Sequence, residues 1–361
     1  MKKIFSVLLC AVLFLCGCAK TQNSVNANPN ENILIDCAGR SVVLPDSTDK
    51  IACLYAYTGH AAVLLDCQDN ICAVVNGLKR DHLMQRKIKN IEDMPCPYAS
   101  GAINIEELAA ANPDLIFLRL SNLQDKGETE KLDNLGIPYI VVDYVTMQDQ
   151  IKSIQVMAKA LGKEEKAEEY INYFNQTVQF VENRVQQLSA SERKTVYHSV
   201  NEVVRTDIPN TLSFQVLETA GCINVVQSEE TMRLDGDKGF VTVEQIYNLD
   251  PDIIVANEPS ATEYFLTDNK FSGLRAVREQ NVFQLPVGIS RWAHPGSIET
   301  PIAILYTAKL VYPNLFDDVD INAEILNFYD KFFDIQLSDE DLQMIISGKG
   351  MRSQKQQGVV K

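Results

Sequence analysis

Apolar residues of this chain form many short strand-like runs and one long helical pattern near its middle. The helical pattern covers residues 147–188 in two parts, the first ending at Gly162 and the second starting at Lys163. In both parts apolar residues recur three and four positions apart, which is typical of an amphipathic helix. At 1.5 Å per residue the second part would extend about 39 Å, roughly the width of a small domain. This length predicts a rigid connection between two lobes.

Two copies of one short signature flank this helical segment. Before it, Glu106 lies seven residues ahead of Pro113, and the apolar run 115–118 follows. After it, Glu244 lies seven residues ahead of Pro251, and the apolar run 253–256 follows. The same spacing at corresponding places on both sides indicates two structurally similar lobes.

Strand-like and helix-like stretches alternate on both sides of the segment. The expected strands are a hairpin at 33–44 and 51–55, 71–75, 115–118, 139–142, 195–200, 253–256 and 282–285; the expected helices are 59–66 with Thr58 as cap, 105–111, 128–135, 211–220, 243–248, 301–311, 321–333 and 339–346. Such alternation favours parallel sheets covered by helices on both faces. We therefore predict an α/β protein of two Rossmann-like lobes with central sheets, joined by a single long rigid α-helix.

Composition agrees with an ordinary two-domain globular protein. The chain has 361 residues, of which 46% are hydrophobic and 22% charged, values typical of packed soluble domains. The formal net charge is −15, which argues against nucleic acid or an anionic membrane surface as a partner.

The N-terminus has the pattern of an export signal. Lys2 and Lys3 precede the apolar run 4–15, which is too short to span a membrane comfortably. The run closes with Leu15-Cys16-Gly17-Cys18, which resembles the bacterial lipobox, where the signal is cut before a cysteine that becomes acylated. This implies lipidation of Cys18 (palmitate among its acyl groups) and a membrane-anchored protein on the extracytoplasmic face, in the periplasm or at the cell surface. An ordinary cleaved signal is the alternative.

These patterns divide the chain into six segments. We expect a signal peptide and lipobox at 1–18, a flexible tether at 19–32, an N-terminal α/β lobe at 33–146, the linking helical segment at 147–190, a C-terminal α/β lobe at 191–347 and a disordered tail at 348–361.

Six further cysteines follow Cys18. They are Cys37, Cys53, Cys67, Cys72, Cys96 and Cys222. Because Cys53 and Cys72 fall in strand-like apolar runs, we expect buried structural thiols. A single disulfide such as Cys67–Cys72 is the alternative in an exported protein, and the spacing does not support a metal site.

The order and spacing of several motifs resemble a known family, the substrate-binding lipoproteins of ABC importers for iron–siderophore complexes, haem and cobalamin, which belong to the helical-backbone class of periplasmic binding proteins. The motifs are residues 36–40 with 42–45, the two Glu/Pro-Asp signatures, 135–138, 218–224 and 292–313. Cys222 and the Asp66-Cys67 pair depart from the usual family residues, both at expected helix ends. The resemblance covers nearly the whole chain after the tether, and it implies two lobes around one linking helix.

The resemblance also implies partners. In this family the signature glutamate of each lobe docks onto arginines of the membrane permease, which places that role on Glu106 and Glu244. The expected partners are thus a permease dimer with its ATPase, a small chelate ligand and, through the lipid anchor, the membrane; the protein itself is expected to be a monomer. Both glutamates would also be ordinary first-turn helix residues, favoured by the helix dipole.

In a two-lobed α/β protein, ligands bind in loops that follow the carboxyl ends of strands. This rule selects the candidate ligand-binding residues. They are Tyr57, Thr58, Gly59, Tyr98 and Arg119 in the first lobe, and Arg205, Thr206, Arg291, Trp292 and His294 in the second. A basic loop with Arg80, His82 and Arg86 follows the strand 71–75 but is not included among them.

The arginines among these residues favour an anionic ligand. Guanidinium groups pair with carboxylate, catecholate or phosphate oxygens, so a ferric siderophore is the first expectation. Haem, cobalamin and a small oxyanion are alternatives. Trp292, the single tryptophan, would stack on the ligand or pack in the core. The four histidines are scattered without a helical pair, so neither a resident metal nor a cofactor is expected.

An enzyme is the main competing class. The sequence Gly288-Ile289-Ser290 lacks the second glycine of a nucleophile elbow, and clustered histidine and aspartate ligands of a metallohydrolase are not evident. A lipoprotein sensor or adhesin with the same lobes is a third class. The sequence names neither the ligand nor the type of cell envelope.

Overall fold

The structure, a computed structural model, describes residues 32–353. Its two central sheets have the same topology. The first consists of β3 Ile51–Cys53, β4 Ile71–Ala73, β7 Leu115–Leu118 and β8 Tyr139–Val141, in the order β4-β3-β7-β8. The second consists of β9 Thr195–Ser199, β11 Ile223–Asn224, β14 Ile253–Ala256 and β15 Val282–Gln284, in the order β11-β9-β14-β15. All neighbouring strands in both sheets are parallel. The prediction of two similar α/β lobes is confirmed.

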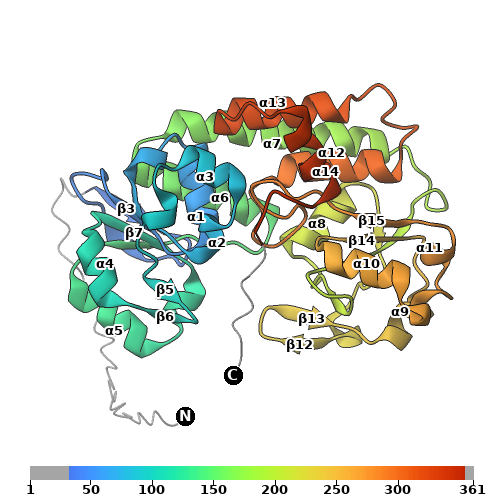
Figure 1. Cartoon of the computed structure of the whole chain (residues 1–361), viewed down its shortest axis with the longest axis horizontal. Helices are drawn as coiled ribbons and strands as arrows, with labels where there is room; N and C mark the ends of the chain where they lie inside the picture. The colour runs from blue at the N-terminus through green and yellow to red at the C-terminus, as the bar shows by residue number, and fades with distance from the viewer. Residues whose placement is uncertain (1–31, 354–361) are drawn as a thin grey trace, which may run out of the picture. The chain divides into compact units, whose positions relative to one another are not determined.

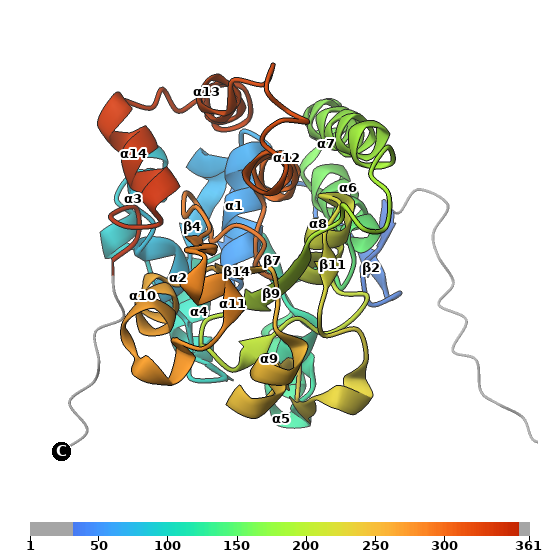
Figure 2. The same cartoon turned by 90° about the vertical axis from the view of Figure 1, so that its right-hand side faces the viewer.

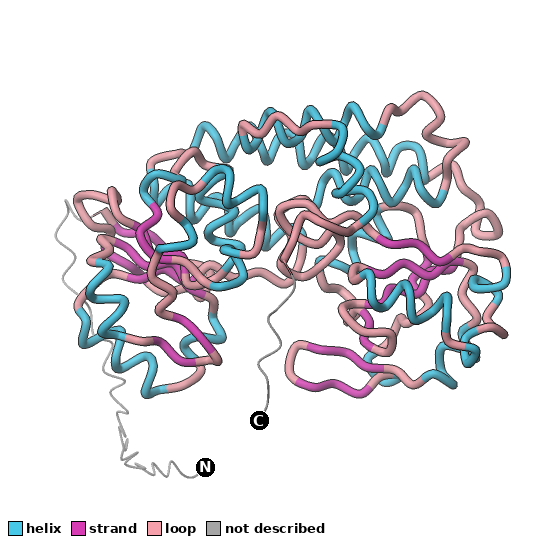
Figure 3. Tube along the Cα trace, viewed as in Figure 1, coloured by secondary structure: helices cyan, strands magenta, loops and turns pink. Residues whose placement is uncertain are grey.

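Helices and short strands surround each sheet (Figures 1 and 3). The first lobe adds the hairpins β1 Ile33–Ile35 with β2 Ser41–Val43 and β5 Tyr98–Ala99 with β6 Ala102–Ile103, and the helices α1 Ala56–Leu64, α2 Asn76–Lys79, α3 His82–Lys87, α4 Ile105–Ala111 and α5 Lys126–Leu135. The second adds β10 Arg205–Thr206, β12 Arg233–Asp235 and β13 Lys238–Phe240, which form a small antiparallel sheet, and the helices α8 Leu212–Thr219, α9 Val243–Leu249, α10 Pro259–Thr267, α11 Arg275–Arg278, α12 Thr300–Val311, α13 Ile321–Phe333 and α14 Asp339–Ser347.

The linking segment is two helices, as its break at Gly162 predicts. The helix α6 Met147–Leu161 ends where Gly162 takes a left-handed conformation with φ 65°, and α7 Glu164–Val185 follows. The helix α7 is the long connection. Near its start Lys166 pairs with Asp66 of the first lobe at 3.0 Å, and near its end Arg184 pairs with Asp318 of the second.

The buried face of α7 packs against the helices that follow the second sheet. Its Tyr170 and Tyr173 rings contact Phe332 and Phe328 of α13, and the Tyr170 hydroxyl donates to the backbone oxygen of Ile298 at 2.6 Å. Figures 1 and 2 show α7 and α13 running alongside each other, with α12 beneath them. Because these helices cover it, the apolar stripe of α7 is part of the core.

The sequence predicted a disordered tail from residue 348 on, but residues 348–353 have defined contacts. Gly348 caps α14, and Met351 is only 1% exposed. Residues 351–353 return to the first lobe, where Asp81 and Arg352 form an antiparallel bridge. The polar composition of this stretch concealed these backbone contacts, which join residues far apart in the sequence. The expectation for 354–361 lies outside the described residues, as do those for 1–18 and for most of 19–32.

The six described cysteines are all free. Cys53, Cys67 and Cys222 are buried, and the other three are half-buried. Burial raises the pKa of the Cys53 and Cys222 thiols to about 12, which keeps them protonated and unreactive near neutral pH. They serve as small packing residues. No helix among residues 32–353 is both long and apolar enough to span a membrane.

Candidate ligand site between the lobes

The strand order of each sheet defines where a ligand would lie. In the first sheet the order reverses between β3 and β7, and in the second between β9 and β14. Loops at the carboxyl ends of such strand pairs form the usual binding crevice of open α/β sheets. Tyr55 and Arg119 follow β3 and β7, while Asn201 and Glu258 follow β9 and β14. Of these four, only Arg119 was predicted.

Arg119 joins the two lobes. Its Nε lies 3.3 Å from Asp143 Oδ1, and its Nη2 lies 3.5 Å from Asp237 Oδ2 in the turn between β12 and β13 of the second lobe. The guanidinium carbon lies 5.5 Å from the centroid of the Tyr55 ring, within the range of a cation–π contact. Burial raises the pKa of Tyr55, although the Arg119 charge opposes this shift, so the phenol is a neutral hydrogen-bonding group.

Arg291 follows β15, and its side chain reaches the switch point of the second sheet. Its Nη1 donates to Asn201 Oδ1 at 2.6 Å and pairs with Glu258, so residues following β9 and β14 hold the side chain. Its Nε is buried and has no protein acceptor among the described residues. Arg291 therefore has a donor to offer to a ligand.

His294 lies beside Arg291. The backbone N–H of Gly296 donates to His294 Nδ1 at 3.0 Å. Burial, with the nearby charges of Arg291, Arg205 and Arg352, holds the pKa of His294 well below its ordinary value, and the ring is neutral at pH 7. His294 Nε2 faces Arg291 Nη2 at 3.1 Å. A neutral ring has one acceptor nitrogen, whereas both of its nitrogens face an N–H donor, one from Gly296 and one from Arg291. An anion beside them would accept a hydrogen bond from the donor that the ring cannot satisfy.

A buried carboxylate shapes the loop that carries these residues. Glu299 accepts hydrogen bonds from the backbone N–H groups of Ile289 at 3.0 Å and Ser290 at 2.6 Å, and from the hydroxyls of Ser290 and Tyr329. Gly288 is required in this loop because a Cβ there would overlap the Tyr329 hydroxyl and the Glu299 carboxylate. This buried network fixes the loop from which Arg291 projects.

Three predicted ligand residues are buried in the first lobe. The helix α1 begins at Ala56 with Tyr55 as its N-cap, so Thr58 is not a cap as predicted. Thr58 instead donates its hydroxyl to the Tyr55 backbone oxygen. Tyr57 is fully buried against Ser153 and Tyr144, and a Cβ on Gly59 would overlap Leu78. These side chains stabilise the fold, and their placement argues against direct ligand contact.

Trp292 is fully buried and packs in the core, which is the alternative to stacking on a ligand. Its ring packs edge-on against Tyr306, with ring centroids 5.5 Å apart. A tight turn, in which Val287 bridges to Arg291, directs Trp292 into the core.

The remaining predicted residues lie in short strands. Arg205 of β10 is half-buried, and its charge acts on His294, so it lies near the group formed by Arg291 and His294. Thr206 next to it is buried, and Tyr98 of β5 is half-buried in a hairpin of the first lobe. Nothing in their contacts ties Thr206 or Tyr98 to a ligand.

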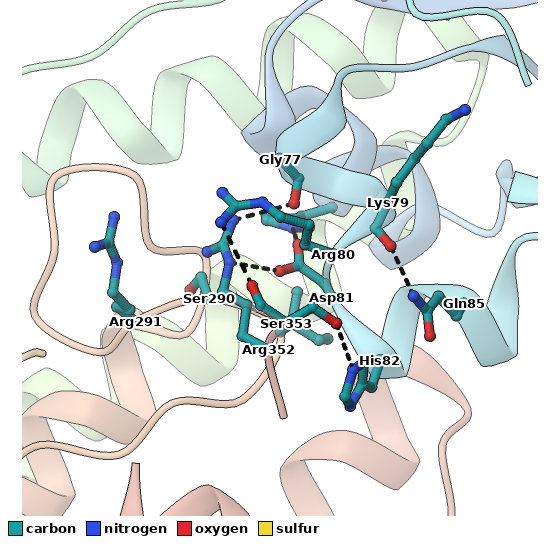
Figure 4. A network of polar contacts seen from close by, with 12 residues as sticks. Gly77, Lys79, Arg80, Asp81, His82, Gln85, Ser290, Arg291, Arg352 and Ser353 are labelled. Carbon is teal, nitrogen blue, oxygen red and sulfur yellow. Dashed lines mark hydrogen bonds and ion pairs between the residues drawn. The ribbon is translucent and has the colours of Figure 1, made fainter. Parts of the chain in front are cut away.

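Two further arginines lie near Arg291. Arg80 follows α2 in the first lobe, and Arg352 belongs to the C-terminal stretch; both charges act on the Arg291 guanidinium, whose pKa is lowered mainly by burial. Figure 4 shows the Arg80 and Arg352 guanidinium groups close together, on the side that faces Arg291. The basic loop after 71–75 was a signal for Arg80, whereas no sequence signal pointed to Arg352.

Other surfaces are weaker candidates. One hollow beside α7 and α8 is lined by residues including Glu182, Arg193 and Glu218, and another beside β12 and β13 by Met232 and Phe240. Neither contains a predicted ligand residue or a convergent set of charges. Within residues 32–353, no group of three or more His, Cys, Asp or Glu side chains could hold a metal ion.

The two signature glutamates occupy equivalent positions. Glu106 and Glu244 lie exposed in the first turns of α4 and α9. In both helices a polar N-cap side chain precedes the glutamate, and a residue in the left-handed conformation ends the helix before the proline. The repeated sequence signature thus corresponds to a repeated local structure.

Comparisons with known proteins agree with this architecture. The family model described as "Periplasmic binding protein" matches residues 53–287. The molybdate-binding protein MolA of Haemophilus influenzae is 23% identical, covering 84% of this chain and 91% of MolA. The ABC transporter substrate-binding lipoprotein YvrC of Bacillus subtilis is 21% identical, covering 87% and 98%. The Fe(3+)-citrate-binding protein YfmC of Bacillus subtilis is 23% identical, covering 78% and 87%.

Solved structures confirm the fold. The structure of MolA bound to molybdate superimposes with a TM-score of 0.73 at 22% identity, covering 85% of this chain and 99% of that one. The family model extends from the first strand of the first sheet to the end of the second sheet. The chain therefore belongs to the periplasmic binding protein family, in the helical-backbone class of ABC-transporter substrate-binding proteins.

Proposed function

We propose that this protein captures a small anion between its lobes and delivers it to the permease of an ABC importer. The observation that carries the proposal is the placement of arginines at both switch points. Arg119 follows β7. Arg291 follows β15 and is held by Asn201 and Glu258, which follow β9 and β14, and His294 lies beside it. In a chain with net charge −15, such a local gathering of cationic side chains favours an anionic ligand.

Among anions, an oxyanion of the molybdate class is our first candidate. Tyr55 Oη of the first lobe lies 3.7 Å from the position of a Cβ on Gly296 of the second, so the lobes approach closely beside the arginines. This closeness favours a compact ligand over haem, cobalamin or a large siderophore. The molybdate relative MolA supports the same choice.

A ferric carboxylate chelate is the second candidate. The relative YfmC binds Fe(3+)-citrate by name, and the same guanidinium groups would pair with citrate carboxylates. This keeps an iron complex, the expectation from the sequence, within the proposal, but with carboxylate oxygens as the recognised groups.

Calorimetric titration of the purified protein tests the ligand class. We expect binding of sodium molybdate, and Arg291→Gln and Arg119→Gln should each weaken it about 10-fold or more, because each removes a charged hydrogen bond. Arg278→Gln, which changes an exposed arginine of α11, should leave the Kd unchanged. Binding of ferric citrate but not molybdate would select the second candidate, and binding of neither anion would contradict the proposal.

We further propose that the mature protein is a monomer held on the extracytoplasmic face by a lipid on Cys18. The support is the lipobox-like sequence and the lipoprotein relative YvrC; Cys18 itself lies outside the described residues. Cells fed a labelled palmitate analogue should label the wild-type protein, and Cys18→Ser should abolish both the label and membrane association. A labelled Cys18→Ser protein would contradict this assignment.

A further inference from the structure

Residues 351–353, here called the C-terminal strap, link the end of the second lobe to the first. The N–H of His82 donates to the Met351 oxygen at 3.1 Å, and the N–H of Ser353 donates to the Arg80 oxygen at 3.0 Å. The Ser353 hydroxyl lies 2.9 Å from His82 Nε2 (Figure 4). With Met351 buried in the core, the strap has a defined place between the lobes.

The strap holds the Arg352 side chain in one direction. Arg352 Nε lies 3.0 Å from Asp81 Oδ1, and Nη2 donates to the Gly77 backbone oxygen at 3.1 Å. Asp81 is fully buried, and its other oxygen lies 2.8 Å from His60 Nε2. These contacts occupy Nε and Nη2 of Arg352, which leaves Nη1 for a ligand. A guanidinium fixed in this way loses little side-chain entropy when it binds.

Arg352 faces the cationic groups of the candidate site. Burial and the charge of Arg352 lower the pKa of Arg80, and the Arg352 charge also acts on Arg291 and His294. The carboxylates nearest these groups are Asp81 and Glu258. Three arginines thus share two carboxylates, and an anion between them would relieve the remaining repulsion.

We propose that Arg352 is a ligand-binding residue, so that the C-terminal strap completes the anion site on the side opposite Arg291. The inference rests on the proposed function and extends it, because it assigns part of the site to the end of the chain. The ligand class is an anion whose several oxygens can accept from guanidinium groups of both lobes, such as an oxyanion or a carboxylate chelate.

The experiment compares molybdate and ferric citrate binding to full-length variants. Arg352→Gln should raise the Kd of the bound anion about 10-fold or more. Because this change leaves Asp81 buried without its partner, the double variant Asp81→Asn/Arg352→Gln removes both charges and should regain thermal stability while binding stays weak. Arg86→Gln is the matched control: it breaks the paired contact of α3 with Asp341 of α14 but lies outside the site, and its Kd should equal that of the wild type.

The outcomes separate the two proposals. If Arg291→Gln weakens binding but Arg352→Gln and the double variant do not, the strap is only structural and the inference is wrong, while the proposed function stands. If the double variant regains both stability and affinity, Arg352 likewise has no role in binding. If the wild-type protein binds neither anion, the proposed function and this inference fail together.

Discussion

The half-buried ring of His294 has an N–H donor beside each of its two nitrogens. Its Nδ1 accepts from Gly296, and its Nε2 faces the Arg291 guanidinium at 3.1 Å. The pKa of the ring is held well below its ordinary value, first by burial and then by Arg291. The folded protein therefore keeps this ring neutral at a pH where the unfolded chain protonates it. Protonation of the unfolded chain then lowers the stability of the folded protein as the pH falls.

The change His294→Gln should flatten the pH dependence of stability. In the wild type the unfolded chain takes up a proton on His294 as the pH falls below about 6.5, while the folded ring stays neutral, so stability is full above that pH and is lost below it. Urea unfolding at several pH values between 5 and 7 should show a smaller loss for the variant. Equal losses in both proteins would contradict the buried, neutral assignment.

Tyr55 was missed because the end of the strand was predicted two residues too late and the start of the helix three residues too late. The strand β3 ends at Cys53, and the helix α1 starts at Ala56, so Tyr55 occupies the loop assigned to Tyr57, Thr58 and Gly59. Arg119 and Arg291 were predicted correctly as loop residues at the lobe interface, since charged side chains after buried strands must face outward. Trp292 points into the core and not toward a ligand because adjacent residues of a tight turn point to opposite sides.

At the scale of elements, the signature helices α4 and α9 were the most predictable parts of the chain. Their N-caps, first-turn glutamates and left-handed ends are all local features, formed by residues within a few positions of one another. The strap was missed for the opposite reason, since its partners are distant in sequence. The hairpin of β12 and β13 is local, with Arg233 paired to Phe240, but its strands are too short to show a periodic pattern.

Charge reversal on these two helices tests the docking role. Glu106→Arg with Glu244→Arg should abolish uptake by intact cells while leaving ligand affinity intact, because both carboxylates are exposed and neither pairs with Arg119 or Arg291. Uptake of the labelled ligand and its Kd are the two measurements. Glu340→Arg in the first turn of α14 is a control that should keep uptake. A loss of ligand affinity in the double variant would contradict docking as their role.

At the scale of the whole molecule, connections at several places restrict how the lobes move. The helix α7 is paired to both lobes, and α3 is tied to α14 by Arg86 and Asp341. The C-terminal strap, which continues the second lobe, adds hydrogen bonds to the first lobe. A hinge with one flexible loop, as in domain-closure proteins, would have none of these constraints.

Ligand binding should therefore change the lobe arrangement only slightly. We expect small-angle scattering with and without the bound anion to give radii of gyration that differ by less than roughly 1 Å, the scale of pre-organised interfaces. Deletion of residues 351–361 should enlarge the difference, since it removes one of the connections. A large contraction of the wild-type protein on binding would show that α7 does not act as a rigid link.

The strap also has a consequence for how the protein reaches its native state. It pairs Asp81 with Arg352 and His82 with Ser353, a separation of 271 residues for the second pair, so the first lobe lacks part of its packing until the last residues arrive. Contacts this distant require the closure of a long chain segment before they contribute stability, and they slow folding. Because domains generally fold in order from the N-terminus, the first lobe gains these contacts only after the whole second lobe and residues 351–353 have been synthesised.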